Sequence, residues 1–139
     1  MSDTSYKTIK LDFVAEGLFE DRKSRFIAQL CHVETESEAQ AFLATVRAKH
    51  YNARHNVPAW SLEDGTERAS DDGEPSRTAG MPVLEVLRGA ELKNVCCVVT
   101  RYFGGTLLGP GGLVRAYTAA TQEALAAAEE ASAVQEMLQ

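Results

Sequence analysis

Five glycines lie within nine consecutive residues, between an apolar run and an alanine-rich segment. Backbone N–H groups between a strand and a helix can point outward at the positive end of the helix dipole, where anions bind. Arg115 in the first turn of the expected helix and Arg101 at the end of the apolar run would add guanidinium groups there. The spacing matches neither G-x-G-x-x-G nor G-x-x-x-x-G-K-[ST], so two interpretations are open: an anion or polyanion contact, or turn geometry with close helix packing. The glycines of this glycine loop (residues 104–112) are Gly104, Gly105, Gly109, Gly111 and Gly112.

A second polar segment carries three carboxylates within four positions, those of Asp71, Asp72 and Glu74. A hard cation such as Mg²⁺ takes ligands of this kind, although the residue order is not that of an EF-hand loop. Short acidic side chains also hydrogen-bond nearby backbone amides and cap helices. Backbone capping, metal binding, and ligand binding or catalysis are therefore all open for this DDGEPS loop (residues 71–76).

His55 and Asn56 begin another apolar run, directly after Arg54. A histidine there could act as a base, as a metal ligand, or as a donor that ties a strand to a loop. It has no companion histidine or cysteine at metal-ligand spacing, and the chain has no G-x-S-x-G setting for an activated serine. We expect no metal and no cofactor. The segment Lys23-Ser24-Arg25 would join the arginines at positions 54, 77, 101 and 115 if the loops converge.

The composition is that of one compact domain, because 139 residues with 45% apolar and 24% charged side chains can bury a core. A net charge of −6 argues against indiscriminate binding of phosphate backbones but is compatible with a local basic patch. No run reaches the roughly 18 apolar residues of a membrane span, and the amino terminus has no apolar signal segment, so we expect a cytoplasmic protein without a membrane partner.

The three cysteines, Cys31, Cys96 and Cys97, lack C-x-x-C spacing. We expect their side chains to be reduced and buried, with Cys96 and Cys97 on opposite faces of a strand.

Hydrophobic periodicity predicts the elements that hold these groups. The expected strands cover 6–13, 24–33, 57–63, 66–70 and 95–100, and the expected helices cover 36–50, 82–89 and 112–131, the last followed by a helical tail that stops at Gln139. Thr35 and Glu38 form a capping box for the first helix, and Pro82 suits the first turn of the second. Asp64-Gly65 predicts a hairpin turn, and Pro58 places its strand at an edge or beside a bulge.

Four segments resemble the YigZ/IMPACT family, in the same order and over nearly all of the chain. They read KSRFIA at 23–28, HN at 55–56, EDGTERASDDGEPSRTAGMP at 63–82 and NVCCVVTRYFGGTLLGPGGLVRAYTAA at 94–120. The resemblance implies an α/β (α+β) two-layer sandwich, with a mixed sheet packed by helices, like the second domain of ribosomal protein S-five and domain IV of the translocation elongation factor. It maps the family's prominent residues onto Lys23, Ser24, Arg25, His55, Asn56, Asp71, Asp72, Glu74, Arg101, Gly104, Gly105, Gly109, Gly112, Arg115 and Tyr117.

For eukaryotic members the resemblance implies regulation of translation under amino-acid starvation, by competition for the protein that activates an initiation-factor kinase. For bacterial members it implies nucleic-acid binding as a hypothesis. Three departures from the family pattern matter. Arg77 stands where the bacterial pattern has glycine, and Val57 stands where a cysteine often follows His-Asn, which excludes a reactive thiol there. Bacterial relatives also carry a second, ferredoxin-like domain, so residues 1–139 are expected to form a single Impact-type domain, either part of a longer chain or acting alone.

We therefore expect a non-catalytic binding domain associated with translation, whose partner is RNA or a ribosome-associated protein. The glycine loop, Arg101 and Arg115 would meet the DDGEPS loop and Lys23-Ser24-Arg25 in one groove that neutralises the charge of the partner. One alternative is an enzyme acting on a phosphorylated or peptide-like small molecule, with the DDGE carboxylates as base or metal ligands and His55 as acid. The other is a protein-interaction regulator of a stress-responsive translation kinase pathway, which requires an exposed apolar or strand-edge patch.

Overall fold

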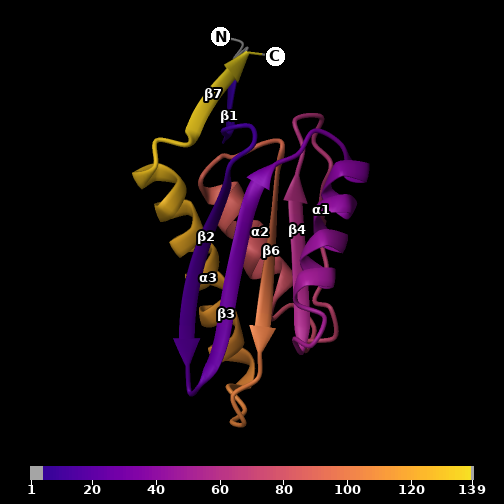
Figure 1. The fold of residues 1–139 in the computed structure, drawn as a ribbon, viewed down its shortest axis with the longest axis vertical. Helices are drawn as coiled ribbons and strands as arrows, with labels where there is room; N and C mark the ends of the chain where they lie inside the picture. Colours follow the sequence, from indigo (N-terminus) through magenta and orange to yellow (C-terminus); the bar gives the residue numbers. More distant parts are fainter. Residues whose placement is uncertain (1–4, 139) are drawn as a thin grey trace.

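A five-stranded sheet in the order β2-β3-β6-β4-β5 forms the centre of the fold. The structure is a computed structural model that describes residues 5–138 (Figure 1). The strands are β2 (Val14–Asp21), β3 (Ser24–His32), β4 (His55–Ser61), β5 (Glu67–Ala69) and β6 (Val95–Tyr102). A separate two-stranded ladder joins β1 (Ser5–Ile9) to β7 (Val134–Leu138) at the end of the molecule where the termini lie. The predicted α+β sandwich is confirmed, but the strands of the described sheet all pair antiparallel, so the sheet is not mixed.

Helices cover both faces of the sheet. Helices α2 (Gly80–Gly89) and α3 (Gly109–Glu130) pack on one face, and α1 (Glu36–Lys49) packs on the other, over β4 and β6. The side chains of β6 alternate between the two sides, with Cys97 in the core under α2 and α3 and Cys96 in the core under α1, as predicted. Within residues 5–138, no helix is both long enough and apolar enough to cross a bilayer.

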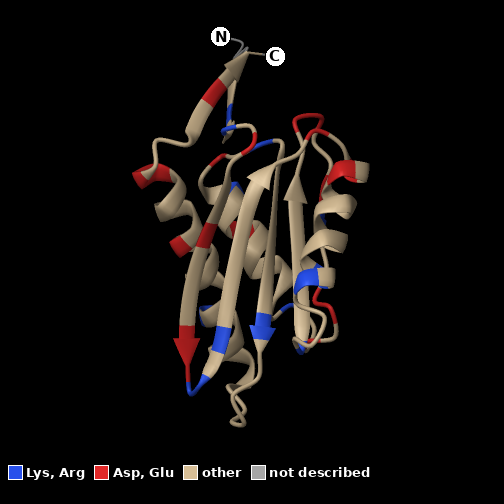
Figure 2. Cartoon of the chain, in the orientation of Figure 1, with Lys and Arg blue, Asp and Glu red and all other residues tan. Residues whose placement is uncertain are grey.

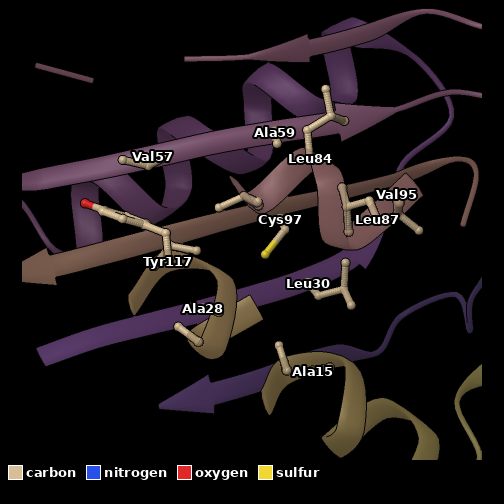
Figure 3. Close-up of a cluster of buried hydrophobic side chains, with 14 of the residues drawn as sticks. Ala15, Ala28, Leu30, Val57, Ala59, Leu84, Leu87, Val95, Cys97 and Tyr117 are labelled. Carbon is tan, nitrogen blue, oxygen red and sulfur yellow. The ribbon is translucent and has the colours of Figure 1, made fainter. Parts of the chain in front are cut away.

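The larger core lies between the sheet and helices α2 and α3 (Figure 3). Small side chains let α3 approach β2 closely: Ala120 and Ala124 of the helix are fully buried, and a Cβ added to Gly17 would lie 2.2 Å from the backbone nitrogen of Ala124. Tyr117 is also fully buried, and its ring packs edge-on against Phe26 at a centroid distance of 5.1 Å. This close packing fixes the first turns of α3 relative to the ends of the strands.

The local signals of the sequence are confirmed in most places. The Thr35 hydroxyl accepts from the Glu38 amide at 3.1 Å, although the Glu38 carboxylate accepts from Glu34 instead of from the capping residue. Gly65 has a φ of 95° in the predicted hairpin turn. Contrary to the edge prediction, β4 lies inside the sheet, but its ladder with β5 begins only at Ala59, one residue after Pro58. Proline at that position therefore interrupts no pairing with β5.

Two strands were not predicted, and one was predicted too long. Strand β1 ends at Ile9, because a turn with Asp12 at a φ of 64° separates it from β2. Strand β2 escaped prediction because apolar residues occur on both of its faces, with Val14 and Leu18 about half exposed and Ala15 buried. Strand β7 follows a turn at Ser132, whose φ of 57° ends α3. Each of these errors lies next to a residue that has a positive φ although it is not glycine. These residues are Asp12 before β2 and Ser132 before β7, and the chain changes direction at both.

Candidate functional site

Five segments meet at one end of the sheet, which we call the loop end. They are the β2–β3 turn, the start of β4, the end of β6 with the glycine loop, the DDGEPS loop and the first turn of α3. The strand register places Arg25 opposite Tyr102, and His55 opposite Arg101. Antiparallel pairing of β2 with β3 and of β4 with β6 therefore brings residues far apart in the sequence to the same place (Figure 1).

The Glu74 carboxylate is the centre of a buried polar network at the loop end. Arg101 Nη1 donates to both of its oxygens, at 2.9 and 2.8 Å, and the Tyr117 hydroxyl donates to Oε2 at 2.6 Å. Glu74 is 7% exposed and Arg101 5% exposed. Burial, together with the nearby Glu74 carboxylate, raises the pKa of Tyr117, so the phenol keeps its proton and remains a donor.

The His55 ring links the DDGEPS loop to β4. Its Nδ1 lies 2.6 Å from the carbonyl oxygen of Asp72, which can only accept, so Nδ1 carries the proton in this bond. Its Nε2 lies 3.5 Å from Glu74 Oε1. The Asp72 carboxylate accepts from the backbone N–H of Asn56 at 2.7 Å. The side-chain oxygen of Asn56 accepts from the Thr100 hydroxyl at 2.7 Å. Asn56 is thus a buried structural residue of the loop end.

Asp71 caps helix α2 from outside the helix. Its carboxylate accepts from the backbone amides of Arg77, Ala79 and Gly80 at 2.9, 3.2 and 3.0 Å, and the residue at the N-cap position, Ala79, offers no side-chain cap. Arg77 has a φ of 66°, in the left-handed region that favours glycine. The glycine of the family pattern at this position is therefore explained by backbone conformation.

The glycines of the glycine loop have different roles. A Cβ on Gly104 would lie 2.2 Å from the carbonyl carbon of Lys23, and its amide donates to the buried hydroxyl oxygen of Ser24 at 3.0 Å. This glycine lets the loop pack against the β2–β3 turn. Gly105 and Gly109 instead have φ values of 93° and 74°, with open space around the position of a Cβ. Gly112 is buried, with Leu108 at 3.0 Å from a Cβ.

The outer part of the glycine loop is open to solvent. Gly105, Thr106 and Leu107 are exposed, and within residues 5–138 their amides have no hydrogen-bond partner. Helix α3 begins at Gly109 without a side-chain cap and without an acidic residue in its first turn. Arg115 is exposed, and its Nη1 lies 3.4 Å from the position of a Cβ on Gly111. Exposed amides of the loop therefore precede a helix start that carries an exposed guanidinium group.

A pocket of about 370 Å³ lies between the DDGEPS loop, the end of β6 and the start of α3. Sequence analysis placed His55, Glu74, Arg101 and Gly109 among the candidate residues, and all four line it. Phe103 and Leu113 were missed, and Arg54 was considered only for its charge. The Arg54 guanidinium carbon lies 4.4 Å from the centroid of the Phe103 ring. An aromatic residue directly before the Gly-Gly pair was the signal available in the sequence.

Two of the predicted charged residues do not serve the expected groove. Arg101 is not free to neutralise a partner, because its guanidinium group is held by Glu74 and is buried. Arg25 lies on the face of the sheet that α1 covers in part, pairs with Glu20 at 3.3 Å, and lines a shallow hollow with Leu18 and Ile27. The exposed cations Lys23 and Arg115 flank the glycine loop.

The carboxylates of the DDGEPS loop are occupied by contacts within the chain. Asp71 binds backbone amides, Asp72 binds the Asn56 amide and approaches Arg47 at 3.5 Å, and Glu74 binds Arg101 and Tyr117. Residues 5–138 contain no cluster of three or more His, Cys, Asp or Glu side chains placed to hold a metal ion. The geometry of these carboxylates is that of a scaffold that positions the pocket.

Comparisons with known proteins give one consistent answer. IMPACT family member YvyE of Bacillus subtilis (strain 168) is 50% identical over 123 residues, which cover 87% of this chain and 56% of the relative. A crystal structure of a protein described as hypothetical has a TM-score of 0.89 at 37% identity, and covers 99% of this chain and 66% of that one. The structure of the two-domain translational regulator Yih1 has a TM-score of 0.54 at 29% identity, and covers 86% of this chain and 49% of that one.

The chain spans little more than half the length of the relative YvyE. The sequence model of the Impact N-terminal domain matches residues 22–125, which include the β2–β3 turn, the DDGEPS loop, the glycine loop and most of α3. That match covers well over half of the sequence. The chain therefore belongs to the Impact N-terminal domain family.

Proposed function

We propose that this domain is a non-catalytic binding module of the translation apparatus and that it holds single-stranded RNA at its loop end. The similarity to the structure of the two-domain translational regulator Yih1 supports the association with translation. The distribution of charge supports RNA as the ligand, because recognition of nucleic acid begins with neutralisation of phosphates by lysine and arginine.

The observation that carries the proposal is the grouping of unpaired cations around an exposed glycine loop. Figure 2 colours several Lys and Arg positions blue at the lower end of the molecule, the loop end, although the net charge of the chain is −6. Arg22 and Lys23 project from the β2–β3 turn, Arg54 precedes β4, and Arg115 lies in α3. Within residues 5–138, none of the four has a carboxylate partner within 4.0 Å.

The glycine loop complements these cations. Arg22 Nη1 donates to the Leu107 carbonyl at 3.4 Å, so the charged turn and the loop lie against each other. The exposed amides of Gly105 and Thr106 are donors for phosphate oxygens, and backbone N–H groups contact nucleic acid in this way without reading its sequence. A strand of RNA crossing the loop would meet side-chain cations on both sides of it.

The test is a titration of a fluorescein-labelled oligouridine of about twelve nucleotides, followed by anisotropy at about 50 to 200 mM salt. The double variant Lys23→Ala and Arg115→Ala should bind more weakly and show a smaller salt slope, by about 0.7 for each phosphate contact removed. Lys10→Ala removes an exposed cation that directly follows β1, away from the loop end, and is the matched control. Equal affinity and equal slope for the double variant and the control would refute RNA binding at the loop end.

The geometry gives less support to the enzyme alternative. A general base or metal ligand must have a carboxylate free to reach a substrate. The Glu74 carboxylate is instead neutralised by Arg101 and covered by Tyr117, while Asp71 and Asp72 hold backbone amides. These contacts make the carboxylates parts of the scaffold.

A protein partner is the second candidate, and one observation favours it. Strand β2 is an edge strand whose outer face shows Val14 and Leu18 at 48% and 50% exposure. An unpaired edge with apolar side chains is a site at which another chain can bind. A Leu18→Lys variant tests this candidate, because it should reduce co-sedimentation with ribosomes without changing the affinity for oligouridine. Unchanged co-sedimentation would exclude this surface.

A further inference from the structure

The pocket beside the glycine loop differs in character from the cationic surface around it. Its apolar walls come from Phe103, Leu108, Leu113 and Pro75, and its polar lining comes from the side chains of Arg54, His55, Glu74 and Arg101. At about 370 Å³ it falls in the range of pockets that enclose a small planar group. We propose that this pocket binds one unstacked nucleobase, whose phosphate lies at the start of α3. The inference rests on the proposed function and adds a specific contact to it.

Arg54 and Phe103 both line this pocket, and the Arg54 guanidinium group lies over the Phe103 ring. The Arg54 guanidinium carbon lies 4.4 Å from the centroid of the Phe103 ring, and the Arg54 amide donates to the Arg101 carbonyl at 2.9 Å, which fixes the backbone. In residues 5–138 the guanidinium group has no carboxylate partner within 4.0 Å. Nucleobases stack on aromatic rings and on guanidinium planes of this kind. The pair therefore offers a stacking surface and free donors for the edge of a base.

The floor of the pocket is polar but neutralised. Arg101 and Glu74 compensate each other, and both are at least nine-tenths buried. The His55 ring, whose side chain is 13% exposed, is held by the Asp72 carbonyl. A neutral polar floor beneath apolar walls suits an uncharged heterocycle better than it suits an ionised group, which would need an unpaired counter-charge there.

The pocket continues into the anion-binding features of the loop end. Gly109 and Pro110, the first residues of α3, form part of its wall, and Arg115, one turn after Gly111, lies over it. A phosphate at this helix start would meet backbone amides and a guanidinium group, while the base attached to it enters the pocket. The ligand chemistry is therefore that of a nucleoside phosphate, which can come from an RNA strand or from a free nucleotide.

The test uses two variants that each remove a stacking group. One keeps the positive charge of the side chain, and the other keeps its apolar character. Arg54→Lys keeps the charge of an exposed side chain and removes its plane, and Phe103→Leu keeps an apolar wall and removes the ring. Each should weaken binding of the labelled oligouridine by about 5- to 150-fold, with an unchanged salt slope. Neither should affect an oligomer of the same length made of abasic nucleotides, which the wild-type protein should bind weakly. Arg68→Lys is the matched control, because it makes the same exchange at an exposed arginine of β5 that does not line the pocket.

The outcomes separate this inference from the proposed function. Two results would show that RNA binds but that the pocket does not hold a base. In the first, oligouridine binds with the expected salt slope and both variants bind it as tightly as the wild type does. In the second, the wild type binds the abasic oligomer as tightly as it binds oligouridine. If no RNA binds, titration with uridine and adenosine monophosphates decides: saturable binding lost in Arg54→Lys assigns the pocket to free nucleotides, and no saturable binding overturns the inference. Saturable binding of an acidic, phenylalanine-containing peptide in place of nucleotides also overturns it. Because the Arg54 side chain is exposed, we expect the Arg54→Lys variant to fold like the wild type.

Discussion

Glu74 and Arg101 form an ion pair whose side chains are 3% and 6% exposed, with both carboxylate oxygens within 2.9 Å of Arg101 Nη1. The pair connects the DDGEPS loop to β6. The Tyr117 hydroxyl of α3 donates to the same Glu74 carboxylate, so α3 is held there as well. Both charges are removed from water, so each depends on the other for compensation. The position of the pocket wall therefore depends on this one contact among three elements.

Replacing Glu74 by alanine should lower the free energy of unfolding by about 3 to 5 kcal/mol, because it leaves the buried Arg101 guanidinium without a counter-charge. Urea unfolding followed by circular dichroism measures this loss. Glu20→Ala is the control, since its exposed pair with Arg25 contributes about 0 to 1 kcal/mol. If both variants lost the same small amount, Glu74 would not be a structural centre of the loop end.

Replacing Gly17 by alanine should disrupt the packing of β2 on α3. The new Cβ would lie 2.2 Å from the Ala124 nitrogen and 2.6 Å from the Ala120 carbonyl oxygen, both of which belong to the helix backbone. We expect a loss of about 3 kcal/mol or more in unfolding free energy, because two rigid elements must separate. Gly89→Ala has open space around it and should be neutral or stabilising by up to about 1 kcal/mol. Similar thermal midpoints for the two variants would contradict the close approach.

The sequence predicted the elements whose signals are local. The Thr35 cap of α1 and the opposite faces of Cys96 and Cys97 depend only on neighbouring residues, and both are confirmed, although the return bond from Glu38 to Thr35 is not formed. Strand β2 was missed because its apolar residues serve two surfaces, one against α3 and one facing outward. Periodicity detects an element only when one face is buried and the other is polar.

For the candidate site, the sequence predicted some features and not others. Sequence analysis found the segments that meet at the loop end, but it could not find the partner of each side chain. Arg101 was expected to face a ligand, yet it faces Glu74, a residue 27 positions away in the sequence. Gly104 was grouped with Gly105, although one packs against the β2–β3 turn and the other is open. Such assignments depend on contacts across the sheet, which neither spacing nor composition encodes.

All three cysteines should react slowly in the native protein. Burial raises the pKa of Cys31 and of Cys97 to about 12, and burial raises that of Cys96 as well. At a pH of about 8 the thiolate fraction of Cys97 is then roughly a thousandfold below that of an ordinary thiol with a pKa of about 8.5. Reaction with Ellman's reagent should be slow in buffer and complete within minutes in guanidinium chloride. Tyr51→Cys, at a position 84% exposed, should add one fast equivalent. A fast equivalent in the wild-type protein would show that one of the buried thiols is accessible.

His50 should make the protein less stable as the pH falls. Its Nδ1 lies 2.6 Å from the Tyr102 hydroxyl, and its Nε2 is buried without a partner within residues 5–138. Burial, followed by the positive charge of Lys49, lowers the pKa of His50, and Glu16 opposes this only in part. The folded state thus holds the neutral ring, while the unfolded chain takes up a proton near its ordinary pKa of about 6.5. As the pH falls through that value, the unfolded state binds more protons than the folded state, and the unfolding free energy decreases.

Urea unfolding of the wild type and of His50→Asn, between pH values of about 7.5 and 5, measures this contribution. The advantage of the wild type over the variant should shrink as the pH falls, because the asparagine does not titrate. Lys49→Gln should reduce the same slope, since it removes the cation that helps to keep the imidazole neutral. Parallel curves for the wild type and His50→Asn would show that the ring takes up its proton equally well in both states. Any slope would then have to come from other titratable groups, and the His50 to Tyr102 contact would hold α1 to β6 independently of pH.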